Sequence, residues 1–99
     1  MKSKKETKKA QKTRELNERF HEMKTSWLQD HPRCERCNGR ASEVHHKKGR
    51  QFEEDGIPLV INEKYFMAVC RECHMYIERN RKESYKKGWL IYRHQQVAS

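Results

Sequence analysis

Four cysteines are arranged as two pairs with the same internal spacing, Cys34-Glu-Arg-Cys37 and Cys70-Arg-Glu-Cys73. Two residues between thiolates let one turn present both sulfurs to a tetrahedral ion, and two such pairs complete a four-sulfur site for structural Zn²⁺. The 32 residues between the pairs mean that the metal closes a loop with structure of its own. The spacing therefore predicts structural zinc at Cys34, Cys37, Cys70 and Cys73.

Two other interpretations of these cysteines explain less. The segment 70–74 (CRECH) also matches the CxxCH signature of c-type haem attachment. That chemistry implies export, for which we find no signal-type sequence, and it leaves Cys34 and Cys37 without a role. A thioredoxin-like redox role is disfavoured because neither pair follows a βαβ pattern. Zinc accounts for all four cysteines.

Three histidines accompany the cysteines. His45 and His46 lie in the segment 44–50 (VHHKKGR), between the two pairs, and His74 directly follows Cys73. Adjacent residues of a strand point to opposite faces, so His45 and His46 can serve one site only at a strand end or a bulge. Alone, such a pair is typical of a solvated basic loop that binds nucleic acid; inside the loop closed by zinc, it also fits a chemical site.

Hydrophobic spacing predicts the elements that position these groups. Leu16, Phe20, Met23 and Trp27 form one stripe of an amphipathic helix from about residue 8 to residue 29, which ends before Pro32. We interpret this stripe as packing against the following domain; DNA contact by the charged faces is the alternative. Segments 41–46 and 65–69 predict a two-stranded ribbon. A helix is expected over 71–79 with an interruption at residue 80, a stop at Gly88 and a covering segment at 89–92.

Composition limits the size and partners of the domain. With 99 residues, of which 33% are hydrophobic, the chain can bury one small core, and a two-domain enzyme is excluded. Lys and Arg exceed Asp and Glu by 23 − 14 = 9, which favours a polyanionic partner. Residues 1–12 contain six lysines, which predicts a flexible basic arm. We expect residues 13–31 to form the helix and residues 32–99 to form the zinc domain. We expect a soluble, cytoplasmic monomer without a membrane partner.

The combined pattern resembles a known family. Cys34-x2-Cys37, Val44-His45-His46 and Cys70-x2-Cys73-His74 are similar to the zinc-bound HNH (His-Asn-His) endonucleases, over roughly residues 27–92. The segment 45–50 (HHKKGR) with the later Gly88-Trp89 is similar to small HNH proteins of bacteriophages. The resemblance implies an α+β fold: a small ββα-metal, treble-clef-like zinc domain preceded by the long amphipathic helix.

The resemblance also implies an activity. It makes the chain a metal-dependent endonuclease that hydrolyses phosphodiester bonds in double-stranded DNA by a one-metal mechanism. His46 is then the general base, and His45 and His74 bind the catalytic cation. Imidazole ligands favour Mn²⁺, Co²⁺ or Ni²⁺ over Mg²⁺. An ordinary imidazole pKa predicts activity that rises between about pH 6 and 7.5. Family analogy adds phage genome processing in the host cytoplasm, with packaging or replication proteins as partners.

The basic residues after the histidines complete this hypothesis. Lys47, Lys48 and Arg50 are expected to hold phosphates that flank the cleaved bond. Such contacts carry no sequence information by themselves, so the enzyme is expected to be weakly specific.

One residue departs from the family pattern. The family usually has Asn five residues before the third cysteine, where it orients the base, but this chain has Tyr65 there and Asn62 three residues earlier. Either Asn62 orients His46 through a bulge, or a backbone carbonyl does so, or catalysis is impaired. Tyr65 therefore keeps two other functions open: a catalytically silent zinc module that binds nucleic acid or a protein, and an RNA-binding zinc protein.

Overall fold

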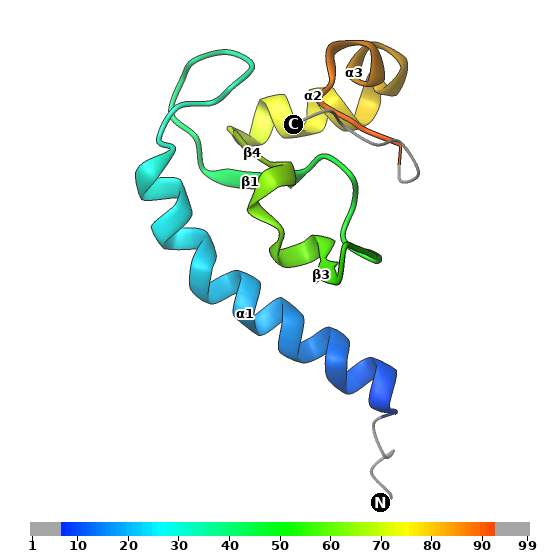
Figure 1. Ribbon diagram of the computed structural model, residues 1–99. Coiled ribbons are helices and arrows are strands. Elements are labelled where there is room, and N and C mark those ends of the chain that lie inside the picture. The colour runs from blue at the N-terminus through cyan, green and yellow to red at the C-terminus, as the bar shows by residue number, and fades with distance from the viewer. Residues whose placement is uncertain (1–6, 93–99) are drawn as a thin grey trace, which may run out of the picture.

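A long helix, a short antiparallel ribbon and a helical pair form an α+β fold in the computed structural model (Figure 1), which describes residues 7–92. No helix within that range is long and apolar enough to cross a membrane. The elements in order are α1 (Lys8–Asp30), β1 (Glu43–His46), β2 (Glu53–Glu54), β3 (Ile57–Pro58), the 3₁₀ turns η1 (Leu59–Ile61) and η2 (Glu63–Tyr65), β4 (Phe66–Val69), α2 (Arg71–Arg79) and α3 (Arg81–Lys87).

Helix α1 matches the predicted stripe and begins earlier than the predicted domain boundary. Its N-cap is Thr7, whose Oγ1 accepts a hydrogen bond from the Ala10 N–H at 3.1 Å. Residues 8–12, assigned by composition to the arm, therefore belong to the first turns of the helix, because lysine and alanine are good helix formers next to a cap. Residues 1–6 of the predicted arm lie outside the described residues. The helix ends at Asp30, as the following His31-Pro32 predicts.

The predicted ribbon is confirmed, and it separates two apolar clusters. Strands β1 and β4 pair antiparallel, with His45 opposite Met67 and His46 opposite Phe66. Alternation along the strands puts Val44 and Phe66 with Phe20 and Trp27 of α1 in one cluster. The opposite face packs Met67, Val69, Cys73, Ile77 and Leu90 in a second cluster. The ribbon thus lies between α1 and the α2–α3 pair, as Figure 1 shows.

The C-terminal half also follows the sequence prediction. The chain leaves the helical conformation at Asn80, between α2 and α3, and buried Ser84 bridges this break by donating to the Ile77 and Asn80 carbonyls. Gly88 ends α3 with a φ of 80°, a left-handed conformation that favours glycine. The next residues fold back over the second cluster: Leu90 is buried, and the Ile91 N–H donates to the Lys47 carbonyl at 2.8 Å.

Between β1 and β4 the chain forms a short hairpin and two 3₁₀ turns. Strands β2 and β3 form a two-residue hairpin whose turn residues Asp55 and Gly56 have φ angles of 52° and 80°. Two consecutive positive φ values define the type I′ turn that the Asp-Gly dipeptide favours. The 3₁₀ turns η1 and η2 then return the chain to the ribbon, where the Lys47 N–H donates to the Tyr65 carbonyl at 2.9 Å.

The attachment of α1 depends on Trp27. Its ring contacts Phe66 edge-on at 5.4 Å between centroids and stacks on His31 at 4.0 Å. We expect Trp27→Ala to lower the free energy of unfolding by about 3–5 kcal/mol, because it removes a large buried ring and leaves a cavity. Urea unfolding of the zinc-loaded protein measures this loss. Exposed Gln29→Ala, two residues along the same helix, is the control and should stay within about 0.5 kcal/mol of the parent.

Candidate metal centres and the adjoining cleft

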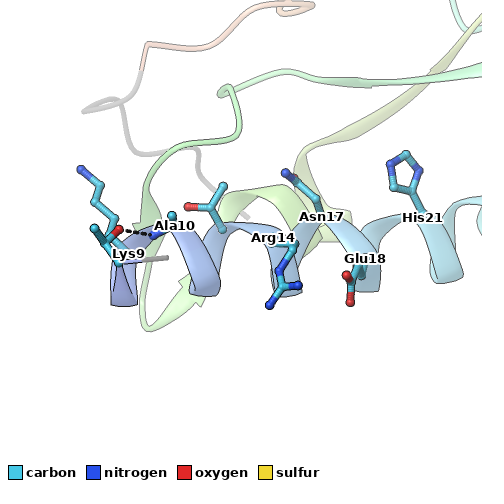
Figure 2. A pocket seen from close by; sticks show the side chains of 8 residues that line it. Lys9, Ala10, Arg14, Asn17, Glu18 and His21 are labelled. Atoms are coloured by element: carbon cyan, nitrogen blue, oxygen red, sulfur yellow. Dashed lines mark hydrogen bonds between the residues drawn. The ribbon is translucent and has the colours of Figure 1, made fainter. Parts of the chain in front are cut away.

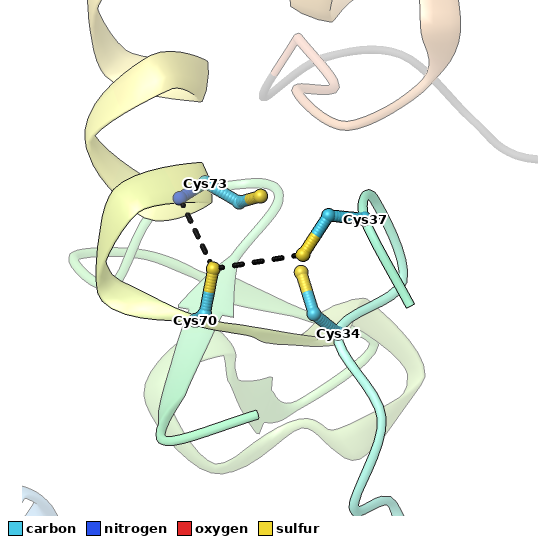
Figure 3. A group of neighbouring side chains, drawn as sticks. All are labelled: Cys34, Cys37, Cys70 and Cys73. Carbon is cyan, nitrogen blue, oxygen red and sulfur yellow. Dashed lines mark hydrogen bonds between the residues drawn. The ribbon is translucent and has the colours of Figure 1, made fainter. Parts of the chain in front are cut away.

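The four predicted cysteine ligands converge (Figure 3). Cys34 and Cys37 come from the loop after α1, and Cys70 and Cys73 come from the start of α2. Their Sγ atoms all lie within 4.8 Å of one another, and the Cys37 and Cys70 sulfurs are 3.8 Å apart. Zinc–sulfur bonds of about 2.3 Å in a tetrahedron require sulfur–sulfur distances of about 3.8 Å. The four-cysteine cluster therefore fits a metal ion such as zinc.

Local backbone geometry prepares the sulfurs for a cation. The Gly39 N–H donates to Cys37 Sγ, and the Cys73 N–H donates to Cys70 Sγ, each at 3.4 Å. A Cβ atom at position 39 would lie 3.3 Å from Cys37 Sγ, so glycine allows this close approach. These N–H groups stabilise thiolate charge, which is the form of cysteine that binds metal.

The pKa values of the cysteines show that the cluster favours one thiolate and disfavours a second. Burial raises the pKa of Cys34, but backbone N–H groups of Cys37, Cys70 and Arg36 outweigh burial and lower that pKa to about 6. Burial and, to a smaller extent, the neighbouring sulfurs raise the pKa of Cys73 to about 12, although the Arg36 guanidinium opposes them. Four adjacent thiolates repel one another unless a divalent cation lies between them.

Arg36 supplies part of the compensating positive charge. Its Nη1 donates to Cys73 Sγ at 3.4 Å, and its guanidinium lies 3.5 Å above the centre of the Tyr76 ring. The hydrogen bond to Cys73 is the main reason that the pKa of Arg36 is raised. Arginine at this position therefore links the sulfur cluster to the middle of α2.

A second group of potential metal ligands lies on the α2 face of the ribbon. Ligand atoms of His45, His74 and Glu78 all lie within 4.8 Å of one another, and His45 Nδ1 is 4.0 Å from Glu78 Oε1. The sequence predicted His45 and His74 as ligands of one cation but did not predict Glu78 as a third ligand. The missed signal is its spacing, since residues i and i+4 share one face of a helix. Two imidazoles and one carboxylate form a donor set that binds divalent transition metals.

Both imidazoles are fixed by partners behind them. His45 Nε2 lies 2.8 Å from the Trp89 carbonyl, and His74 Nδ1 lies 2.7 Å from Glu43 Oε1. Because these oxygens only accept, each of those nitrogens donates, and the other nitrogen of a neutral ring keeps its lone pair. Burial lowers the pKa of His45, which favours that neutral form. Ligand histidines typically have such a carbonyl or carboxylate behind them.

His46 points to the opposite face, toward α1. Its ring lies 4.8 Å from the Phe20 ring and 5.2 Å from the Phe66 ring, and 8% of the residue is exposed. Nε2 donates to the Val60 carbonyl at 3.0 Å, which leaves the lone pair on Nδ1. Burial lowers the pKa of His46 to about 4. A pKa this low does not support the expected rise of activity between pH 6 and 7.5, because this ring is already neutral there.

Of the three expectations for orienting His46, the structure contains the backbone carbonyl. The Asn62 side chain caps η2 instead, where its Oδ1 accepts from the Lys64 N–H at 3.1 Å. Tyr65 turns away into another network and donates its hydroxyl to Glu54. The hydrogen-bond acceptor for His46 is thus the carbonyl of Val60, two residues before Asn62.

The three basic residues after His46 have different environments. Lys48 was expected to hold phosphate but is buried, forms an ion pair with Glu54 and lies 4.7 Å above the Tyr65 ring. These contacts do not favour the expected phosphate contact, because the ammonium already has an anionic partner inside the domain. Lys47 is half-buried, whereas Arg50 is exposed and donates to Asn17 Oδ1 at 2.9 Å.

A cleft of about 500 Å³ connects these groups at the end of β1. His46 and Glu78 both line it, so it reaches residues from the two faces of the ribbon. Lys47, Arg50 and Arg81 add positive charge to its walls. This combination offers a neutral imidazole, a carboxylate belonging to a metal-ligand group, and cations suited to an anionic substrate.

No protein-family model, curated protein or solved structure matches this chain. The functional assignment therefore rests on the geometry and chemistry of its own residues.

Folding is expected to require metal at the four-cysteine cluster. Cys70→Ser or complete chelation should abolish cooperative unfolding, because a structural zinc site supplies on the order of 10 kcal/mol to the folding of a small domain. Circular dichroism melting, with bound metal measured in the same samples, tests this expectation. Glu72→Gln, an exposed change between Cys70 and Cys73, should melt as the parent does. A verified metal-free parent with native spectrum and melting would contradict the requirement.

Stability is expected to fall in acid partly through His46. Its pKa is about 4 in the folded chain against an ordinary 6.5, so the unfolded chain binds this proton first as pH falls. Between pH 7 and pH 5 this linkage removes about 2 kcal/mol from the free energy of unfolding. Urea unfolding at both pH values should show a decrease about 2 kcal/mol smaller in His46→Gln. Protonation of the cysteines affects both proteins, so equal decreases would contradict the assignment to His46.

Proposed function

We propose that the protein is a metal-dependent DNA endonuclease with a treble-clef-like ββα-metal domain of the HNH type. The observation that carries this proposal is the group formed by His45, His74 and Glu78. His45 directly precedes His46 in strand β1, and the two side chains lie on opposite faces of that strand. In the proposal these three residues bind the catalytic cation, the four-cysteine cluster binds structural zinc, and His46 is the general base. The order β1, β4, α2 supports the ββα assignment.

The ligand group suits phosphodiester hydrolysis. A divalent cation bound there supplies positive charge that stabilises the charge developing on the phosphate and on the departing 3′ oxygen. The Trp89 carbonyl and the Glu43 carboxylate accept from one nitrogen of each ring, which leaves His45 Nδ1 and His74 Nε2 as the atoms that would bind the cation. Glu78 adds one negative charge, which strengthens binding of a dication. Its oxygen also makes the preference for Mn²⁺, Co²⁺ or Ni²⁺ over Mg²⁺ smaller than with imidazoles alone.

His46 has the properties of an oriented proton acceptor. The Val60 carbonyl holds Nε2–H and thereby fixes the tautomer in which Nδ1 accepts a proton from water. This hydrogen bond does the orienting work that Asn performs in the resembled family, so Tyr65 does not by itself argue against catalysis. The depressed pKa keeps the base neutral at any working pH, although it also weakens the base.

Charge favours nucleic acid as the substrate. Lys47 and Arg50 line the cleft beside His46, and the chain carries a net charge of +9. Arg81 also lines the cleft, where it pairs with Glu78 at 3.2 Å. Cations of this kind contact phosphates and carry no base information, which supports a weakly specific enzyme. A role in phage genome processing follows from family analogy alone.

One observation favours a second candidate, the catalytically silent zinc module. His46 is 8% exposed and packs against two phenylalanine rings, as a purely structural histidine would. In that case the cleft binds nucleic acid without cutting it. Measured cleavage distinguishes the two functions.

Nicking of supercoiled plasmid by the zinc-loaded protein, with Mn²⁺, Co²⁺, Ni²⁺ or Mg²⁺ added in turn, tests the proposal. His46→Ala and His46→Gln should lose about 100-fold or more in rate, because a general base contributes about 10²–10⁴. Glu78→Ala and His74→Ala should instead require more cation for the same rate. Glu72→Gln, an exposed carboxylate on the same helix, is the matched control and should cut as the parent does.

Two outcomes of this assay would each overturn one part of the proposal. The first is a parent protein that cuts with none of the cations. The second is a folded His46→Gln variant that cuts as fast as the parent. The first result would leave the silent zinc module as the function, and the second would remove His46 as the general base.

A further inference from the structure

A second basic groove continues from the cleft toward α1. The loop residues Arg50, Gln51 and Phe52 line the cleft that contains His46, and the same three residues line two further hollows of about 460 and 320 Å³. The opposite wall of both hollows is the N-terminal half of α1, including Lys9 and Thr13. One loop thus separates the site proposed for cleavage from a groove that the cleavage mechanism does not use.

The groove is positively charged. Lys9, Lys12 and Arg50 line it, against one carboxylate from Glu53. Among the described residues, the first turn of α1 contains no acidic side chain that would offset the positive end of the helix dipole. Figure 2 shows Lys9 and Asn17 rising from the same side of α1, while Arg14 and Glu18 point away from it. Cations on one wall and on the loop therefore face a shared space.

The loop wall is held in place rather than left loose. Arg50 Nη2 donates to Asn17 Oδ1 at 2.9 Å, and its guanidinium lies 5.1 Å above the centre of the Phe20 ring. Both contacts join the loop to α1, and the hydrogen bond connects residues 33 positions apart in the chain. A groove fixed in this way loses less entropy when a ligand binds.

An aromatic ring lies at the same place. Phe52 is 47% exposed and lines the cleft and both hollows. A basic groove that follows a phosphate backbone, combined with an exposed aromatic ring on which a base can stack, is the usual chemistry of single-stranded nucleic acid binding. A duplex keeps its bases stacked on each other and offers Phe52 no free base face.

We propose that the groove between α1 and residues 50–52 binds a single-stranded segment of nucleic acid next to the cleavage site. Lys9, Lys12 and Arg50 contact its phosphates, and Phe52 stacks on one of its bases. The inference rests on the proposed function, because that function makes the neighbouring cleft a cleavage site. Binding in the groove is nevertheless measurable without cleavage. Branched, frayed or gapped DNA is the class of substrate that presents such a segment beside a duplex.

Binding of a fluorescein-labelled thymidine oligonucleotide of about 15 nucleotides, followed by fluorescence anisotropy, tests the groove. The zinc-loaded full chain is used without any added catalytic cation. Lys9→Gln with Lys12→Gln should weaken binding and reduce the slope of log K against log salt by about 1.4, since each phosphate that a lysine neutralises on a single strand adds about 0.7 to the slope. Lys82→Gln with Lys86→Gln, exposed lysines of α3, is the charge-matched control and should change both quantities less.

Phe52 has its own pair of variants. Phe52→Ala should weaken binding of the oligonucleotide by about 5-fold to 100-fold, the range for loss of one stacked base, whereas Phe52→Trp should retain it. The same variants should change the binding of a blunt duplex of equal length less than that of the single strand, because the bases of a duplex are already stacked on each other. Phe52 is exposed, so neither change endangers the fold.

The outcomes separate this inference from the proposed function. Equal losses for the α1 and α3 lysine pairs, or an unchanged affinity of Phe52→Ala for the single strand, would overturn the groove even if the parent cuts DNA. Losses confined to the groove variants support the inference even if no cation promotes cleavage, in which case only the endonuclease is lost.

Discussion

The convergence of four sulfur atoms from two separated segments is the constraint on which the rest of this fold depends. A chain with 37% charged and 33% hydrophobic residues has little apolar surface to bury, and its two clusters lie on opposite sides of a ribbon of four residue pairs. The cluster joins the loop after α1 to the start of α2 and so holds that ribbon from one end. Without a cation, the pKa of Cys34 is lowered and that of Cys73 is raised, so the cluster holds one thiolate and disfavours a second. A dication removes the competition and turns a crowded group of thiols into a cross-link.

The ribbon then divides the chemistry between its two faces. His45 turns to α2 and joins His74 and Glu78, while His46 turns to α1 and packs among aromatic rings. The two faces meet only at the strand end, where the cleft begins, and the chain there continues into the loop that Arg50 fastens to α1. Helix α1 therefore has two roles: its apolar stripe covers His46, and its first turns form the wall of the basic groove. A change in how α1 packs would alter the environment of the imidazole and the shape of the groove together.

The sequence predicted much of this fold because its signals are local. The CxxC spacing, the stripe from Leu16 to Trp27, the ribbon, the break at Asn80 and the stop at Gly88 all follow from neighbouring residues. It missed what depends on tertiary contact. The sequence pattern predicts an exposed Lys48, but Glu54, six residues further along the chain, pairs with it inside the domain. The sequence does not distinguish Glu78 from the other carboxylates, because its place beside His45 depends on the packing of α2 against the ribbon. The low pKa of His46 depends on the aromatic rings of α1 and β4, which no local pattern around His46 reveals.

The register of the ribbon restricts how such a chain can change its length over evolution. Alternation means that one residue inserted within 43–46 would exchange the faces of the residues on one side of it, and it would put His45 among the phenylalanines or His46 against α2. The chain between His46 and the 3₁₀ turns lies outside that register, and its hairpin contains two residues in each strand. Insertions and deletions in related chains are therefore expected to accumulate around residues 51–58. The spacing from the first cysteine pair to the histidines should vary far less than the spacing from the histidines to the second pair.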